Sequence, residues 1–156
     1  MRLEVGPGSR PKLVGEDVIY LDIRRQDTPN LILADAENLP FRDETFDEVM
    51  ASHVIEHPLD PKRFIRETHR VLRLEGKLVI YTPNFLSINV WKDPDHKHSF
   101  NVFNIKQLLA PEFKVHYMCN IAHRIPFKRL FKLLFLIVSD ELAVVGFYQP
   151  TRYHLH

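Results

Sequence analysis

The sequence predicts an α/β domain with a mainly parallel sheet. Short runs of β-branched and apolar residues recur along the 156-residue chain, and stretches with helical periodicity lie between them. Strands that are apolar along nearly their whole length are typical of a parallel sheet with helices on both faces. The length suits one domain with one core, which we expect to extend over residues 1–156. The expected strands cover residues 2–5, 18–23, 31–34, 46–53, 77–82, 113–119 and 142–149.

The first two expected strands enclose a glycine turn. Residues 2–8 read Arg-Leu-Glu-Val-Gly-Pro-Gly, and an acid, Asp22, closes the next apolar run. Glycines let the backbone approach a ligand closely, and a carboxylate at the end of the second strand can bind both hydroxyls of a ribose. Pro11 stands where the dinucleotide fingerprint has its third glycine, and this disfavours NAD. A ligand that contains adenosine but no pyrophosphate remains open.

The connection between these two strands is unusually short. The segment from Gly8 to Asp22 leaves little room for a crossover helix, which normally needs a dozen or more residues. We expect Ser9 to cap a single helical turn over residues 10–14 that ends at Gly15. The free N–H groups at the start of this turn would add to the ligand site.

The clearest helix is expected over residues 60–74. Asp60 is a good N-cap, Pro61 suits the first turn, and Gly76 suits the C-terminal cap. A shorter helix is expected over residues 104–110. The buried stripe of the first helix consists of Phe64, Ile65, Thr68, Val71 and Leu72.

Composition excludes several classes of function. A net charge of +1, from 21 basic and 20 acidic residues, provides no field that would attract nucleic acid or an anionic membrane. The single cysteine, Cys119, forms no internal disulfide, so we expect a reducing compartment and a cytoplasmic protein. The first strand begins almost at Met1, without a signal peptide, and the most apolar stretch, residues 133–138, is too short to span a bilayer.

Five motifs support one another along the chain. They are Leu3-Glu-Val-Gly-Pro-Gly8, Asp35-Ala-Glu-Asn-Leu-Pro-Phe41, Phe46-Asp-Glu-Val-Met-Ala-Ser-His-Val-Ile-Glu-His57, Arg70-Val-Leu-Arg-Leu-Glu-Gly-Lys-Leu-Val-Ile80 and Thr82-Pro-Asn84. Together they resemble the class I S-adenosylmethionine-dependent methyltransferases, in particular the small-molecule branch similar to ubiquinone and menaquinone methyltransferases. The resemblance implies a Rossmann-like sheet of about seven strands with the last strand antiparallel, and S-adenosyl-L-methionine as the cofactor.

The resemblance assigns five positions to the methionine end of the cofactor. Glu4, Gly6 and Gly8 would surround the methionine part. Ser52 and His53, at the end of the fourth expected strand, would face the cofactor near the same end.

Four further positions are assigned to the adenosine end. Asp22 would bind the ribose hydroxyls, and Ile23 would pack on the adenine. Asp35 would accept a hydrogen bond from the adenine amino group, with the backbone of Ala36 beside it.

Histidines are the candidates for catalysis. Residues 93–100, Asp-Pro-Asp-His-Lys-His-Ser-Phe, resemble a His-x-His-x-Phe stretch that lies over the active site in the same branch. His96 or His98 would bind substrate or remove a proton, since histidine titrates near neutral pH, and His53 is the next candidate. For His53 and His57 the plainer interpretation is a structural histidine near the pocket wall.

A metal site at this loop is not expected from the sequence. His96 and His98 have the spacing of metal ligands, and Asp93 and Asp95 lie nearby. Two histidines in a loop nevertheless lack an obvious third ligand.

Residues 126–138 predict an amphipathic helix between the last two strands. Its plainer interpretation is packing on the sheet or as a lid. The alternative is a homodimer interface, or a surface for a lipophilic substrate or membrane. The apolar face consists of Phe127, Leu130, Phe131, Leu134 and Val138, opposed by Lys128, Arg129 and Lys132.

The predicted activity is methyl transfer from S-adenosylmethionine to a small molecule, by O- or C-methylation. The sulfonium already activates the methyl group, so the protein mainly holds nucleophile and methyl in line. A base is needed only for an oxygen acceptor that is not already ionised. Residues 82–84, Thr-Pro-Asn, do not resemble the Asn/Asp-Pro-Pro-Tyr motif of amino-directed nucleic-acid methyltransferases, which disfavours adenine or cytosine amino groups as acceptors.

Two alternatives stay open. Members of the branch usually carry helices before the glycine motif, and this chain has none, so the pocket is open or a partner closes it. The chain would then be a cofactor-binding partner or regulatory subunit without turnover. The other alternative is methylation of RNA or protein, for which a basic surface is available from Arg124, Lys128, Arg129, Lys132 and Arg152.

Overall fold

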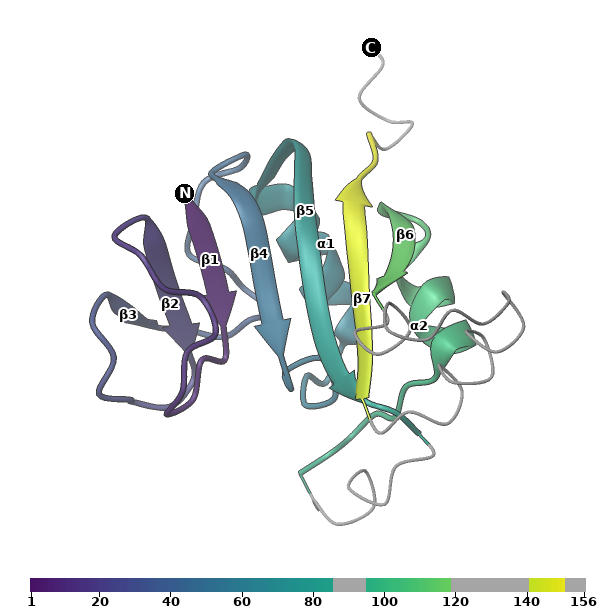
Figure 1. The fold of residues 1–156 in the computed structure, drawn as a ribbon, viewed down its shortest axis with the longest axis horizontal. Coiled ribbons are helices and arrows are strands. Elements are labelled where there is room, and N and C mark those ends of the chain that lie inside the picture. The colour runs from purple at the N-terminus through teal and green to yellow at the C-terminus, as the bar shows by residue number, and fades with distance from the viewer. Residues whose placement is uncertain (86–94, 119–140, 151–156) are drawn as a thin grey trace, which may run out of the picture.

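The computed structural model describes residues 1–85, 95–118 and 141–150, which form one sheet with two helices (Figure 1). The helices are α1 (Pro61–Val71) and α2 (Val102–Leu109). The strands are β1 (Arg2–Val5), β2 (Val18–Asp22), β3 (Leu31–Leu33), β4 (Phe46–Ser52), β5 (Leu72–Pro83), β6 (Phe113–Met118) and β7 (Glu141–Tyr148).

The seven strands of the described sheet lie in the order β3-β2-β1-β4-β5-β7-β6. The first five pair in parallel with their neighbours, whereas β7 is antiparallel to both β5 and β6. This confirms the predicted mainly parallel sheet with an antiparallel last strand. The chain runs outward from β1 to β3 and then returns to place β4 on the other side of β1, so the strand order reverses between β1 and β4.

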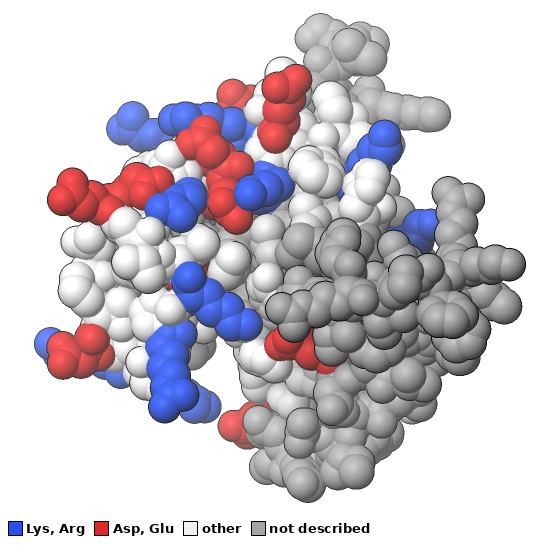
Figure 2. All heavy atoms as spheres, in the orientation of Figure 1, with Lys and Arg blue, Asp and Glu red and all other residues white. Residues whose placement is uncertain are grey.

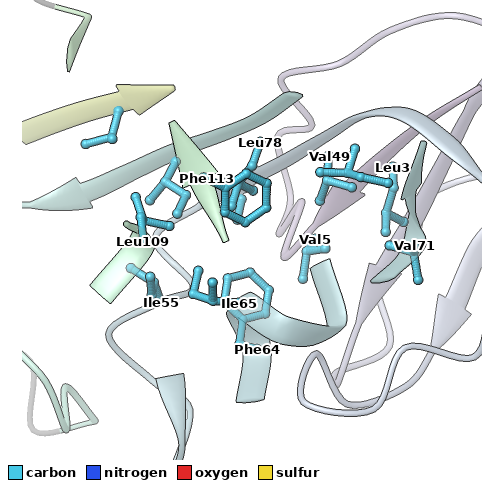
Figure 3. Packing of buried hydrophobic residues seen from close by; sticks show 14 of the residues in the cluster. Leu3, Val5, Val49, Ile55, Phe64, Ile65, Val71, Leu78, Leu109 and Phe113 are labelled. Carbon is cyan, nitrogen blue, oxygen red and sulfur yellow. The ribbon is translucent and has the colours of Figure 1, made fainter. Parts of the chain in front are cut away.

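One face of the sheet carries the main core. Alternate residues of the strands point to this face and pack against both helices, as Figure 3 shows. The contributing side chains include Leu3, Val5, Val49 and Leu78 from the sheet, Phe64 and Ile65 from α1, Leu109 from α2 and Phe113 from β6.

The opposite face holds a smaller apolar cluster. It consists of Leu13, Val18 and Tyr20, with Leu31 and Met50 packed against it. The Tyr20 hydroxyl donates to the backbone oxygen of Leu13 at 2.7 Å. Both described helices belong to the main core, so the expected helical cover of this second face is not found within residues 1–85, 95–118 and 141–150.

The clearest predicted helix exists, but it ends three residues early. Asp60 caps its start as expected, with Oδ1 accepting from the backbone N–H groups of residues 62 and 63. The helix stops at Val71 because Leu72 takes an extended conformation and pairs with Phe46 in the sheet. The expected end at residue 74 and the cap at Gly76 are therefore wrong, and β5 begins at Leu72. The shorter helix begins at residue 102, two residues before the expected start, and Asn101 forms a capping box with Asn104.

The predicted helical turn over residues 10–14 is absent. Glu4 reaches across from β1, and its carboxylate accepts hydrogen bonds from the backbone N–H groups of Lys12 and Leu13 at 2.7–3.0 Å. These contacts hold the segment as an irregular loop, so no helix start follows the glycine turn.

The predicted amphipathic helix over residues 126–138 and the suggested basic residues Arg124 and Arg152 lie outside the described residues. Within the described part, neither helix has the length and apolar character that crossing a membrane requires.

Candidate functional site

A cavity of about 930 Å³ opens at the carboxyl ends of β1, β2 and β4. This is where the strand order reverses, and open α/β sheets bind ligands outside the carboxyl ends of strands at such a point. Figure 2 shows a hollow at the lower edge of the face seen in Figure 1, with Lys and Arg side chains beside it. All the positions predicted for the cofactor line this one cavity: Glu4, Gly6, Gly8, Asp22, Ile23, Asp35, Ala36, Ser52 and His53.

Gly6 and Gly8 are needed in the turn for different structural reasons. Both have positive φ, +67° at Gly6 and +55° at Gly8. A Cβ on Gly6 would lie 2.4 Å from Cγ2 of Val54, whereas a Cβ on Gly8 would meet nothing within 4 Å. Gly6 is thus required by packing within the protein, and Gly8 leaves room beside the cavity.

Glu4 shapes the loop that borders the cavity. It is 1% exposed, and its carboxylate binds the backbone of Lys12 and Leu13. The adjacent Lys12 ammonium lies 4.1 Å from the centre of the Tyr81 ring. The sequence indicated Glu4 as a site residue, but it gave no signal for this contact with the loop.

Two aspartates stand at the ends of β2 and β3. Asp22 Oδ1 accepts from the backbone N–H of Arg24, and Asp35 Oδ1 accepts from that of Glu37, each at 2.9 Å. Each contact fixes one carboxylate oxygen within its own turn. Ile23, beside Asp22, is 73% exposed at the cavity, which is unusual for a large apolar side chain next to a strand end.

His53 lies between two carboxylates at the end of β4. Its φ is +55°, and its side chain is half exposed, with Nε2 at 2.9 Å from Glu141 Oε1 and Nδ1 at 3.5 Å from Glu56 Oε1. The pKa of His53 is raised, chiefly by its closeness to Glu56 and with a contribution from the charge of Glu141, while burial acts in the opposite direction. The arrangement therefore favours the protonated imidazole.

The segment after residue 94 is fastened to the turn that follows β4. The backbone N–H groups of Lys97 and His98 donate to the backbone oxygen of Glu56 at 2.9 and 3.1 Å. His57 Nδ1 lies 3.2 Å from the backbone oxygen of Asp95. These contacts bring the predicted histidine loop to the rim of the cavity.

The histidines of this loop do not themselves line the cavity. Asp95 and Lys97 line it. His98 Nε2 lies 3.0 Å from the backbone oxygen of Pro58, and His96 lies beside His57 with 5.1 Å between ring centres. The catalytic roles of His96 and His98 stay predictions.

The structure adds residues that sequence reasoning did not select. Arg10, Lys12, Arg24 and Lys97 bring positive charge to the cavity wall. Isolated surface lysines and arginines give no local signal in a sequence. Glu56 had such a signal, because it lies between His53 and His57 in one motif, but it was not selected.

The chain is similar to known methyltransferases in sequence. Residues 13–80 match the family described as a methyltransferase domain. A probable S-adenosylmethionine-dependent methyltransferase of Mycobacterium tuberculosis is 36% identical over 95 residues, which cover 58% of this chain and 35% of that protein. The chain thus spans about a third of the length of this relative.

Two relatives are named for quinone chemistry. The 2-methyl-6-phytyl-1,4-hydroquinone methyltransferase 1 of Oryza sativa is 44% identical over 54 residues, which cover 35% of this chain and 16% of that protein. The demethylmenaquinone methyltransferase of Thermotoga maritima is 43% identical over 49 residues, which cover 31% of this chain and 21% of that protein.

Solved structures share the fold over nearly the whole chain. The YcgJ protein of Bacillus subtilis superposes with a TM-score of 0.68 at 16% identity, covering 96% of this chain and 92% of that one. A methyltransferase of Thermotoga maritima described as a possible histamine N-methyltransferase gives a TM-score of 0.70 at 18% identity, covering 95% and 82%.

The strand order and these structural matches define a class I methyltransferase fold. The more particular resemblance, to the S-adenosylmethionine-dependent methyltransferases including quinone methyltransferases, is confirmed by the domain match and the named relatives.

Proposed function

We propose that the chain binds S-adenosyl-L-methionine in the cavity at the carboxyl ends of β1, β2 and β4 and transfers its methyl group to a small molecule. The observation that carries this proposal is the convergence of all the predicted cofactor positions, from four strand ends, on one cavity. In this proposal Asp22 binds the ribose hydroxyls and Ile23 covers the adenine. The glycine turn and Ser52 flank the methionine part.

For the acceptor, we propose an aromatic quinol-like ring that is methylated on oxygen or carbon. The names of the Oryza sativa and Thermotoga maritima relatives support this class. Methyl transfer to a neutral phenol requires removal of a proton. His96 and His98 remain the proposed bases, with His53 after them, although the raised pKa of His53 opposes that role.

The test begins with the cofactor. Isothermal titration of the purified protein with S-adenosylmethionine and S-adenosylhomocysteine is expected to give micromolar binding of both. A screen of quinols, phenols and amines with methyl-labelled cofactor then identifies the acceptor. If neither compound binds, the proposed site is refuted. If the cofactor binds but no acceptor is methylated, the result favours the regulatory alternative.

We further propose a cytoplasmic protein without a nucleic-acid partner that associates as a homodimer through residues 126–138. Sedimentation velocity tests the dimer. An affinity for RNA that falls steeply as salt rises would contradict the proposed absence of a nucleic-acid partner, because phosphate contacts have this salt dependence.

A further inference from the structure

A buried carboxylate next to the cavity has one oxygen that accepts no hydrogen bond from the part of the chain that the structure describes. Glu56 is 1% exposed, and its Oε2 accepts from Thr82 Oγ1 at 3.1 Å. Its Oε1 is buried and has no hydrogen-bond partner among residues 1–85, 95–118 and 141–150. Leaving a buried polar atom unsatisfied costs about 1–3 kcal/mol, and more for a charged group, so this oxygen calls for an explanation.

The imidazoles of His57 and His96 lie close to the Glu56 carboxylate. Glu56, His57 and His96 each offer one ligand atom, and these atoms lie within 4.8 Å of one another. His96 Nε2 is 3.9 Å from Glu56 Oε1. We propose that Glu56, His57 and His96 bind a divalent transition-metal ion, with Zn²⁺ as the favoured ion.

The surroundings of this cluster resemble those of metal ligands. Metal-binding histidines usually donate their second ring N–H to a backbone carbonyl or carboxylate, and ligating carboxylates are hydrogen-bonded in turn. His57 Nδ1 lies 3.2 Å from the backbone oxygen of Asp95, which leaves Nε2 for a metal. Thr82 holds the other oxygen of Glu56. The backbone N–H groups of Lys97 and His98 fasten the His96 loop to Glu56 itself.

The competing explanation is an ion pair between Glu56 and a protonated His53. Its Nδ1 is 3.5 Å from Glu56 Oε1, longer than the usual 2.7–3.2 Å of an N–H···O hydrogen bond. The Nε2 of the same ring already contacts Glu141 at 2.9 Å. His53 therefore forms an ion pair with this oxygen, but the contact is too long for a good hydrogen bond.

The donor set selects the class of ion. Two imidazoles and one carboxylate are the protein ligands of open zinc sites, where a fourth position remains for water or substrate. Ligand atoms in such a tetrahedron are about 3.3 Å apart when the bonds are about 2.0–2.1 Å long, so small side-chain rotations would close the group. The sequence alone indicated no further ligand to complete a metal site at the histidine loop. The fold brings Glu56 and His57 to His96 and so completes a set of three.

The ion would lie at the wall of the cavity, because His57 lines it. Its open position suits an oxygen of the methyl acceptor. This consequence rests on the proposed function with His98 as the base, because a metal ion bound to His96 would exclude that residue from the role; the metal site itself does not rest on the proposed function.

The test is a titration of the untagged, metal-free protein with Zn²⁺, in which binding is followed by isothermal calorimetry. One ion per chain is expected in the wild type. Loss of an outer-shell partner alone costs about 10–100-fold in metal affinity, so Glu56→Gln, His57→Asn and His96→Asn are each expected to weaken binding at least about tenfold. His116→Asn is the matched control, because His116 is exposed on β6. A variant with both His154 and His156 replaced by Asn removes the chain-end histidines as ligands.

Co²⁺ supplies a second measurement. Its visible spectrum reports the ligand set, and His96→Asn is expected to change it while His116→Asn is not. Circular dichroism establishes that each variant is folded, and His96→Asn keeps the test decisive if Glu56→Gln unfolds the protein. Zn²⁺ binding that is absent, or equal in the three ligand variants and the control, would overturn the proposal. S-adenosylhomocysteine binding, measured separately without metal, distinguishes this failure from failure of the cofactor site.

Discussion

Replacing Asp22 with Asn tests the position of the ribose most sharply. In the structure, Asp22 Oδ1 accepts from the Arg24 N–H at 2.9 Å. The variant keeps an oxygen for this contact, so the turn after β2 is retained. The amide NH₂ then replaces the second carboxylate oxygen, and it cannot accept from a hydroxyl.

The expected loss follows from that geometry. A hydrogen bond to a charged group contributes about 1.5–3 kcal/mol, and each 1.4 kcal/mol is about a tenfold change in affinity. Asp22→Asn is thus expected to weaken S-adenosylhomocysteine binding by about 10- to 150-fold. Asp22→Ala is expected to fall in the same range, at about 1–3 kcal/mol.

Isothermal titration measures the effect, with Asp27→Asn as the matched control. Asp27 is exposed in the same loop and does not line the cavity, so its replacement is expected to leave affinity unchanged. Equal affinities in the Asp22 and Asp27 variants would show that the ribose is not bound at the end of β2, and the assignment of the adenosine end would be wrong.

Three further predictions concern the framework. Gly6→Ala is expected to lower the free energy of unfolding in urea more than Gly8→Ala. Both variants gain backbone strain of about 1–2 kcal/mol at positive φ, but only the Cβ at position 6 makes a close contact. Equal losses of stability would contradict this. Phe64→Ala, which empties a fully buried site, is expected to cost about 3–5 kcal/mol, and a loss below 1 kcal/mol would place Phe64 outside the core. Glu67 has a pKa below its ordinary value, mainly because it binds Arg70, so Glu67→Gln is expected to be less stable than the wild type at pH 7. That gap closes as pH falls through the lowered pKa; a gap that is constant with pH would refute the ionic contribution.

Local pattern predicted the strands well because their residues are buried. The starts of β1, β2 and β4 fall at their predicted residues, since each run of apolar residues must be covered. The ends of elements were less predictable because distant partners set them. Leu72 fits the helical stripe, but pairing with Phe46 takes it into the sheet. The turn expected after Ser9 fails because Glu4, from another strand, binds the N–H groups that a helix would use.

The candidate site followed from topology combined with resemblance. Parallel strands bring their carboxyl ends to one edge, so motifs far apart in sequence converge there, as Asp22 and Asp35 do. The loop histidines were less predictable. Backbone hydrogen bonds to Glu56 decide where His96 and His98 lie, and no periodicity in the sequence carries that information.

The two buried glutamates beside the cavity separate a structural from a functional carboxylate. Glu4 and Glu56 are both 1% exposed. Glu4 lies in β1 and Glu56 in the turn after β4, the two strands between which the strand order reverses. Both oxygens of Glu4 accept backbone N–H groups, so its desolvation is offset within the fold. Within the described residues, Glu56 Oε1 has no such partner. Burial alone would make the two residues equivalent. Hydrogen-bond satisfaction distinguishes them, because a fold that keeps an unsatisfied carboxylate oxygen near the imidazoles of His53 and His96 retains a free-energy cost that a bound cation would offset.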